Sequence, residues 1–306
     1  MIPPAAAEPL TERLIAAALR AGTRLMAGRA FHAGLPVELH RRRVLQAVRL
    51  TFPPRGTQFT AGSCGGIAGE WATARDSAPV PLTILYLHGG GYVSGSPATH
   101  RAITGQLAAR CRARVFAADY RLAPEHPFPA ALDDAVAAYL GLLADGVAPA
   151  SVVIAGDSAG GGLAVATAVR LRDETRPLPR ALVLFSPWAD LTLGQFAPVA
   201  GEIMLNRSWL EEAACHYAGH GDLRHPLVSP VFAALQGLPP TLLQVGTDEL
   251  LLDDSRRLFR RLQDSGVAAR LEEYPRRWHV FQLHAGVLAD ADRALDAVAR
   301  FVAAAH

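Results

Sequence analysis

Short apolar runs alternate with helix-like segments along most of the chain, from about residue 80 to the C-terminus. The runs have the length and composition of buried strands, whereas the other segments repeat apolar residues every three or four positions, like one face of a helix. Strands are predicted at Val80–Leu87, Val115–Ala118, Ser151–Ala155, Ala181–Phe185, Thr241–Val245 and Arg270–Tyr274. Helices are predicted at Thr99–Arg112, Pro129–Ala144, Gly161–Arg172, Leu250–Gln263 and Asp290–Ala304. These units predict an α/β fold, in which helices cover both faces of a mostly parallel sheet.

Two regions fall outside this alternation. Residues 1–50 have the pattern of two amphipathic helices, at about Pro9–Ala27 and Val37–Arg49. Residues 190–225 interrupt the sheet pattern with mixed helical signal and include Trp209 and Tyr217. The carboxyl ends of parallel strands meet at one edge, where such sheets bind ligands. An insertion at that edge would form a lid, and the alternative is a surface excursion without a role.

Composition narrows the class of protein. The chain has 306 residues, half of them hydrophobic, so it can bury a large core as one α/β domain or two smaller ones. No apolar stretch reaches the ~18 residues needed to span a bilayer. Met1–Pro4 lacks the basic and apolar regions of a signal peptide. Three widely spaced cysteines predict neither a disulfide framework nor a metal site, which favours a cytoplasmic location.

The net charge of +2 does not point to a polyanionic partner. All basic residues are arginine, and the densest cluster, Arg41–Arg43, lies inside a predicted helix. Such a cluster is usually a solvated helix face. No nucleic-acid motif accompanies it, so we predict no nucleic-acid partner.

Ser158 lies at the centre of Gly156–Gly160, which has the G-x-S-x-G pattern. A predicted strand leads into this pentapeptide and a predicted helix leads out of it. That context is typical of a sharp turn that exposes a nucleophilic serine at the top of a sheet. A serine hydroxyl needs a base, a third group that orients the base, and donors for the oxyanion that forms on attack.

A glycine run that ends the Val80–Leu87 strand supplies candidate oxyanion donors. It reads His88-Gly89-Gly90-Gly91, and small residues there let backbone N–H groups face a cleft. A dinucleotide-binding loop would need a third glycine where this chain has Ser94, and no GK[ST] follows. The run instead fits the H-G-G-G oxyanion motif, completed by the N–H of Ala159.

Asp248 is the predicted acid, because it follows the Thr241–Val245 strand on a loop at the active edge. Glu249 could substitute for it. Asp253 and Asp254 fall in the first turns of the next helix, where the helix dipole favours aspartate in a structural role.

His279 is the predicted base among 11 histidines, because it follows the next strand, Arg270–Tyr274. His284 is expected on a helix, and His88 belongs to the glycine run before the serine. The resulting order Ser158, Asp248, His279 is that of the α/β hydrolases.

At these residues the chain resembles the hormone-sensitive-lipase-like family of bacterial carboxylesterases, from about residue 60 onward. The segments that carry the resemblance are His88–Tyr92, Asp119–Asp134, Gly156–Gly161, Ser186–Leu191 and Gly246–Leu250. Around the histidine this chain reads Trp278-His279-Val280-Phe281-Gln282, where many relatives read His-Gly-Phe. This variant also resembles a subset of the family, so the assignment of His279 is kept.

The resemblance implies an α/β-hydrolase fold over residues 51–306. Residues 1–50 would form an N-terminal helical cap, and an insertion at about 190–225 would add to that cap. It implies Ser158, Asp248 and His279 as the triad. It also implies Gly90, Gly91 and Ala159 as oxyanion donors, with Gly89 shaping the turn. Esters of short to medium acyl chains and a homodimer are expected by resemblance only.

Several neighbours of these residues have two interpretations. Asp157 could influence the nucleophile electrostatically, and we favour a structural role. Glu125 is predicted to hydrogen-bond the glycine loop as support for the donors. Tyr92 would either line the acyl pocket or pack in the core. Trp209 and Tyr217 are expected in the core of the cap rather than against substrate.

The sequence therefore predicts a serine carboxylesterase that needs no metal or organic cofactor. Acyl transfer or amide cleavage with the same residues is the alternative, because only the group that attacks the acyl-enzyme differs. A non-catalytic receptor for a small ligand can also use this fold, and an incomplete triad would indicate one. None of the three triad residues is missing here.

Overall fold

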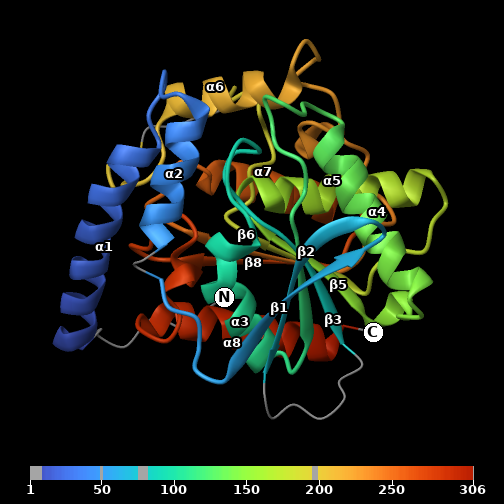
Figure 1. The fold of residues 1–306 in the computed structure, drawn as a ribbon, viewed down its shortest axis with the longest axis horizontal. Coiled ribbons are helices and arrows are strands. Elements are labelled where there is room, and N and C mark those ends of the chain that lie inside the picture. Colours follow the sequence, from blue (N-terminus) through green and yellow to red (C-terminus); the bar gives the residue numbers. More distant parts are fainter. Residues whose placement is uncertain (1–8, 49–50, 75–81, 195–198, 306) are drawn as a thin grey trace.

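The computed structural model describes residues 9–48, 51–74, 82–194 and 199–305. Its centre is an eight-stranded sheet in the order β1-β2-β4-β3-β5-β6-β7-β8, seen in Figure 1. The strands are β1 Thr57–Cys64, β2 Ile67–Ala74, β3 Thr83–Leu87, β4 Arg114–Ala118, β5 Val152–Asp157, β6 Ala181–Phe185, β7 Thr241–Gly246 and β8 Ala269–Tyr274. The strands from β3 to β8 are all parallel. The predicted mostly parallel sheet is therefore confirmed.

Helices cover both faces of this sheet. They are α3 Arg101–Arg110, α4 Ala130–Ala144, α5 Ala159–Asp173, α7 Leu252–Asp264 and α8 Ala289–Ala304. Alternate residues of a strand point to opposite faces, so Leu85 packs in the core formed with α4 and α5, whereas Ile84 packs in the core formed with α3 and α8. The predicted helix at 99–112 begins as the 3-10 helix η2, Pro97–His100, and continues as α3.

The hairpin of β1 and β2 was not predicted. Its two strands pair antiparallel with each other, and β2 pairs antiparallel with β4. Much of β1 is exposed at the edge of the sheet, so its sequence lacks the continuous apolar run of a buried strand. Polar edge strands carry a weaker pattern than buried ones, which explains why the sequence pattern missed this hairpin.

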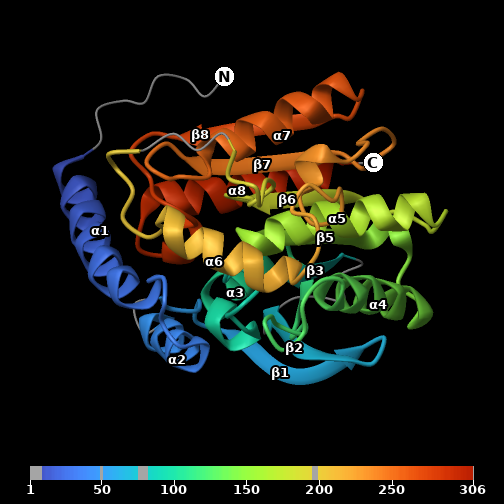
Figure 2. The same ribbon diagram turned by 90° about the horizontal axis from the view of Figure 1, so that it is seen from above.

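Three further helices lie at one end of the molecule, α1 Leu10–Ala30, α2 Val37–Ala47 and α6 Arg207–Ala218. Figure 1 and Figure 2 show α1 and α2 beside α6. The ring of Phe31, which follows α1, meets the Trp209 ring of α6 edge-on at 4.7 Å. The N-terminal segment and the insertion therefore pack on each other, as two parts of one cap would.

Helices occur where residues 1–50 and 190–225 predicted them, while their assignment to a cap stays a prediction. Residues 1–8, 49–50, 80–81 and 195–198, on which part of the sequence predictions fell, lie outside the described residues. Among the residues that are described, no helix has both the length and the apolar content to cross a bilayer.

Candidate active site

Ser158 occupies a tight turn between β5 and α5. It has φ 53° and ψ −121°, a conformation that costs free energy for any residue with a side chain. The flanking glycines are required by close approach, since a Cβ on Gly160 would lie 2.0 Å from the Leu87 carbonyl oxygen of β3. The predicted strand–turn–helix context of Ser158 is therefore present in the structure.

His279 and Glu249 form a buried pair at the ends of the neighbouring strands. The loop after β7 carries Glu249, and the loop after β8 carries His279. The Nδ1–H of His279 donates to Oε1 of Glu249 at 3.0 Å, because a carboxylate oxygen can only accept. A neutral ring that keeps its proton on Nδ1 presents Nε2 as an acceptor.

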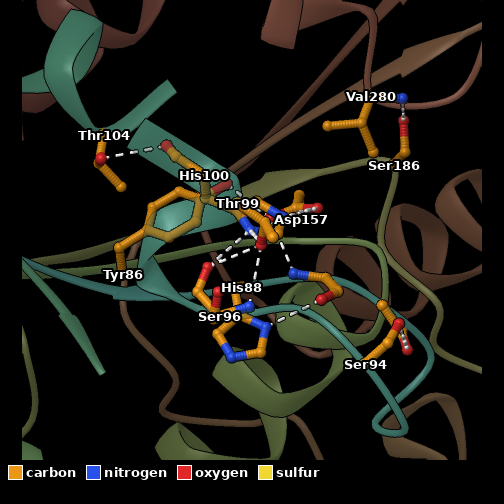
Figure 3. Close-up of polar contacts among 12 residues, drawn as sticks. Tyr86, His88, Ser94, Ser96, Thr99, His100, Thr104, Asp157, Ser186 and Val280 are labelled. Atoms are coloured by element: carbon orange, nitrogen blue, oxygen red, sulfur yellow. Dashed lines mark hydrogen bonds and ion pairs between the residues drawn. The ribbon is translucent and has the colours of Figure 1, made fainter. Parts of the chain in front are cut away.

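Two further donors hold the Glu249 carboxylate. The Ser186 hydroxyl donates to Oε2 at 2.7 Å, and the Gly246 N–H donates to the same oxygen at 2.9 Å. The Ser186 oxygen in turn accepts from the Val280 N–H at 3.2 Å, a contact drawn in Figure 3. Ser186 therefore connects the acid's loop to the base's loop, a role that the sequence analysis did not assign.

The prediction that Asp248 orients His279 is wrong in this structure. Asp248 instead accepts from Nη1 of Arg20, on α1, at 2.9 Å. Adjacent residues of a loop turn their side chains in different directions, and here the second of the two, Glu249, faces the histidine. The sequence pattern placed an acid on this loop but could not distinguish Asp248 from the adjacent Glu249.

Asp254 has the structural role that the sequence predicted. Its carboxyl accepts from the N–H groups of Ala189 and Asp190, and burial raises its pKa to about 7.

The environment of His279 shifts its basicity. Burial by itself lowers the pKa of His279, because it penalises the imidazolium, but the charge and hydrogen bond of Glu249 outweigh it. The pKa of His279 consequently lies above its ordinary value. The carboxylate thus favours a proton on the ring, as a general base requires during attack.

Ser158, His279 and the glycine run line one cavity of about 130 Å³. The turn at Gly90 and Gly91 has positive φ values of 120° and 64°. Among the described residues, none accepts a hydrogen bond from the N–H groups of Gly90, Gly91 or Ala159. These donors are free to bind an oxygen in the cavity, although their role as an oxyanion hole stays a prediction.

Gly89 differs from the two glycines that follow it. Its N–H donates to Oδ1 of Asp157 at 3.0 Å, and a Cβ at this position would lie 2.2 Å from Oδ2 of the same carboxylate. His88 donates from Nδ1 to the Gly89 carbonyl oxygen at 2.9 Å, and its ring stacks on Tyr120 at 4.2 Å. Burial lowers the pKa of His88 to about 3, so the ring is neutral. These contacts fix the backbone just before the two free donors.

Glu125 does not bond the glycine loop, contrary to the prediction. Its carboxylate pairs with both Nη atoms of Arg41, on α2, at 2.8 and 2.7 Å. Arg41 also donates to the carbonyl oxygens of Val93 and Ala123, at 2.9 and 3.0 Å. Arg41 is thus a partly buried bridge, and its predicted place on a solvated face is wrong. The sequence could not show this, because the partners lie more than 50 residues away.

Tyr92 packs in the core and is not among the described residues that line the cavity. Its ring stacks on Tyr217 at 3.6 Å and 7° between the planes. Trp209 does line the cavity, in addition to packing against Phe31. The expected core packing of Trp209 is therefore confirmed, and its ring forms part of the cavity wall as well. Helix α6 lies over the glycine loop, so closely that a Cβ on Gly91 would lie 2.7 Å from the Trp209 ring.

Sequence reasoning missed most of the cavity wall. Helix α1 contributes Thr23, Met26 and Ala27, and the α2 segment contributes Val44 and Ala47. It also missed His100, from η2, which lines the cavity beside Asp157. The amphipathic pattern of residues 1–50 signalled buried faces, but not what they face.

Comparison with known proteins shows which family has this arrangement of sheet and site. Residues 84–283 match the family model of the alpha/beta hydrolase fold. An acetyl-hydrolase of Streptomyces hygroscopicus is 44% identical over 252 residues, which are 81% of this chain and 83% of that protein. An esterase of Acinetobacter venetianus is 37% identical over 268 residues, which are 85% of this chain and 87% of the relative.

Solved structures are also similar to this chain over nearly its whole length. A crystal structure of an esterase from the bacterial hormone-sensitive lipase family superposes with a TM-score of 0.86 at 36% identity, covering 97% of this chain and 98% of the other. A hormone-sensitive lipase from a metagenome library superposes with a TM-score of 0.87 at 37% identity, covering 94% and 97%. At 97% of the chain, the first match takes in at least part of α1, α2 and α6 as well as the sheet.

Proposed function

We propose a mechanism for this chain, which belongs to the bacterial hormone-sensitive-lipase-like esterases of the alpha/beta-hydrolase superfamily and is a carboxylic ester hydrolase. In this mechanism the enzyme acts through a Ser158–His279–Glu249 triad and an acyl-enzyme intermediate. The observation that carries this proposal is the 3.0 Å contact from Nδ1 of His279 to the buried Glu249 carboxylate. It supports a tautomer with Nε2 free, in the cavity that Ser158 also lines.

The proposed reaction has two halves. The Ser158 hydroxyl attacks the ester carbonyl while Nε2 of His279 takes its proton. Backbone N–H groups of Gly90, Gly91 and Ala159 bind the tetrahedral oxyanion, and His279 then protonates the leaving alcohol. Water, deprotonated by the same histidine, hydrolyses the acyl-enzyme. Glu249 orients the ring and stabilises the imidazolium, and none of these steps requires a metal or cofactor.

A panel of p-nitrophenyl esters with acyl chains from C2 to C16 tests the substrate range. We expect kcat/KM to be highest below C12, because Met204, Leu205 and Trp209 wall a cavity of only about 130 Å³. A maximum at C12 or longer would replace this proposal with a true lipase. Adding an alcohol or amine to the same assay detects acyl transfer, which we expect to be minor beside hydrolysis.

The pH dependence of kcat/KM gives a second test. Only neutral His279 can act as a base, and its pKa lies above the ordinary value of about 6.5. Activity should therefore fall as the pH drops through a value above 6.5, earlier than an unperturbed histidine would predict. A profile that stays flat down to about pH 5 would contradict the role of His279.

The homodimer and the cytoplasmic location stay predictions. Size-exclusion chromatography with light scattering measures the first, and fractionation of the producing cell measures the second.

A further inference from the structure

A buried histidine–carboxylate pair lies directly behind the glycine loop. Oδ2 of Asp157, at the end of β5, is 3.3 Å from Nε2 of His100, at the end of η2. Figure 3 shows the two side chains facing each other, with Tyr86 on the same carboxylate. The Tyr86 hydroxyl donates to Oδ1 at 2.6 Å, and the Gly89 N–H donates to that oxygen at 3.0 Å. The proposed triad uses none of these side chains.

Both ring nitrogens of His100 face acceptors. Nε2 faces the Asp157 carboxylate, while Nδ1 lies 3.2 Å from the Ser96 carbonyl oxygen and 2.8 Å from the Thr99 hydroxyl oxygen. That hydroxyl already donates to the Ser96 carbonyl oxygen at 2.8 Å and accepts from the Ser96 N–H at 2.9 Å. A neutral ring with its proton on Nδ1 would direct a lone pair at the carboxylate, and one with its proton on Nε2 would need the Thr99 hydroxyl to turn its proton from the Ser96 carbonyl oxygen to Nδ1. An imidazolium donates from both nitrogens and satisfies every partner.

We propose that His100 is a positioning residue, held as an imidazolium whose ion pair with Asp157 fixes the Gly89 N–H and, through it, the oxyanion donors of Gly90 and Gly91. The pair acts on the loop because Asp157 is the shared partner of His100 and Gly89. A buried carboxylate that lost the cation would move toward other donors or take up a proton, since an unpaired buried charge is costly. A shift of the carboxylate would break its bond with the Gly89 N–H, and a proton on it would weaken that bond, because a neutral acid is a poorer acceptor than a carboxylate. The inference rests on the proposed oxyanion role of this loop.

Among the groups that face it, His100 is the one whose charge we expect to change with pH. Asp157 faces it from β5, Tyr86 from β3 and His88 from the glycine loop, where the two imidazole rings stack at 5.5 Å. Burial holds His88 neutral and raises the pKa of Tyr86 well above its usual range. Burial also disfavours the His100 cation, but the Asp157 charge and hydrogen bond outweigh it and raise the pKa of His100. His279 and His284 line the same cavity.

The sign of the pH effect follows from these contacts. A raised pKa means that the ion pair persists to higher pH than an unperturbed histidine would allow, and that it is lost as the pH rises through the pKa of His100. The pH profile of activity should therefore have an alkaline limb, a fall at high pH caused by His100, in addition to an acid limb, the fall at low pH caused by His279. The alkaline limb should appear in kcat, because the oxyanion donors act on the transition state more than on the bound ester.

The protonation state can be measured on the unmodified protein. Long-range ¹H–¹⁵N spectra of the histidine rings should show two rings, His279 and His100, that stay imidazolium to higher pH than an unperturbed histidine, and one of these two signals should vanish in His100→Gln. A His100 ring with a single protonated nitrogen at pH 7 would overturn the proposal. This measurement does not depend on whether any variant keeps its activity.

Two variants separate the charge from the packing. In His100→Phe an aromatic ring remains, but the hydrogen bonds of both ring nitrogens are lost. We expect kcat to fall about 10²-fold with little change in KM, as for loss of an oxyanion donor. In His100→Gln an amide can still donate to Asp157 but has no proton to lose, so more activity should survive and the alkaline limb should disappear. An unchanged alkaline limb in His100→Gln would contradict the proposal.

A trifluoromethyl ketone inhibitor reports on the donors directly, because its adduct with Ser158 places an oxyanion in the same position. Its inhibition constant should rise in His100→Phe by the same factor by which kcat/KM falls. An unchanged inhibition constant in a folded variant would show that the loop keeps its geometry without His100. Loss of activity in Ser158→Ala together with normal kinetics in His100→Phe would overturn this inference alone and leave the esterase mechanism intact.

Discussion

Replacing Ser158 by alanine is expected to lower kcat for p-nitrophenyl butyrate by about 10⁶-fold, which is the size of effect seen when a serine nucleophile is removed. Alanine keeps the Cβ and therefore the backbone of the turn, so the fold should be retained. The measurement is the initial rate together with the thermal unfolding midpoint of both proteins. The burst of p-nitrophenol that signals acyl-enzyme formation should also be absent.

Activity close to that of the unmodified protein in Ser158→Ala would remove the proposed nucleophile. A loss of activity that accompanies unfolding would be a folding effect, and the unchanged midpoint expected here excludes it. Mass spectrometry gives an independent test, because a fluorophosphonate should label the unmodified protein once and should not label the variant.

The adjacent acids Glu249 and Asp248 should differ sharply when each is replaced by its amide. Glu249→Gln is expected to reduce kcat by about 10⁴-fold, because an amide can direct its NH₂ group at Nδ1 and stabilise the wrong tautomer of His279. Asp248→Asn should change kcat less than about threefold, since the Arg20–Asp248 pair is partly exposed and such pairs contribute at most about 1 kcal/mol. The kinetic constants and unfolding midpoints of the two variants check both expectations.

Asp248→Asn is the matched control for Glu249→Gln, because it makes the same chemical change one residue earlier on the same loop. The reverse result, with Asp248→Asn the more damaged enzyme, would restore the acid predicted from the sequence. Equal and small effects would show that His279 needs no carboxylate partner.

The loop after β7 carries an acid whose presence the sequence predicted and whose identity it did not. Strand and helix periodicity placed Asp248 and Glu249 at the active edge, since the buried strand Thr241–Gly246 has a clear apolar pattern. Choosing between them depends on the backbone direction at the loop, which is set by contacts with Ser186 and Arg20 from distant parts of the chain. A local pattern holds no information about such contacts.

The same limit applies to Glu125 and Tyr92. Both lie in or near segments with a recognisable motif, so a role at the site was a reasonable prediction. Their partners, Arg41 and Tyr217, belong to α2 and α6, whose position relative to the sheet is a tertiary property. The β1–β2 hairpin was missed for a different reason, because an edge strand that is half exposed lacks a strong apolar signal.

The sequence by itself determined the parallel sheet, the turn at Ser158 and the placement of the glycine run and His279 at strand ends. These features depend on local periodicity and on small residues where backbones approach closely, and both can be recognised in a linear pattern. Only the tertiary structure decided that Glu249 faces His279, that Trp209 and α1 wall the cavity, and that His100 pairs with Asp157 behind the glycine loop. Each of these depends on residues far apart in the chain, and such residues meet only once the sheet and the helices around it have packed.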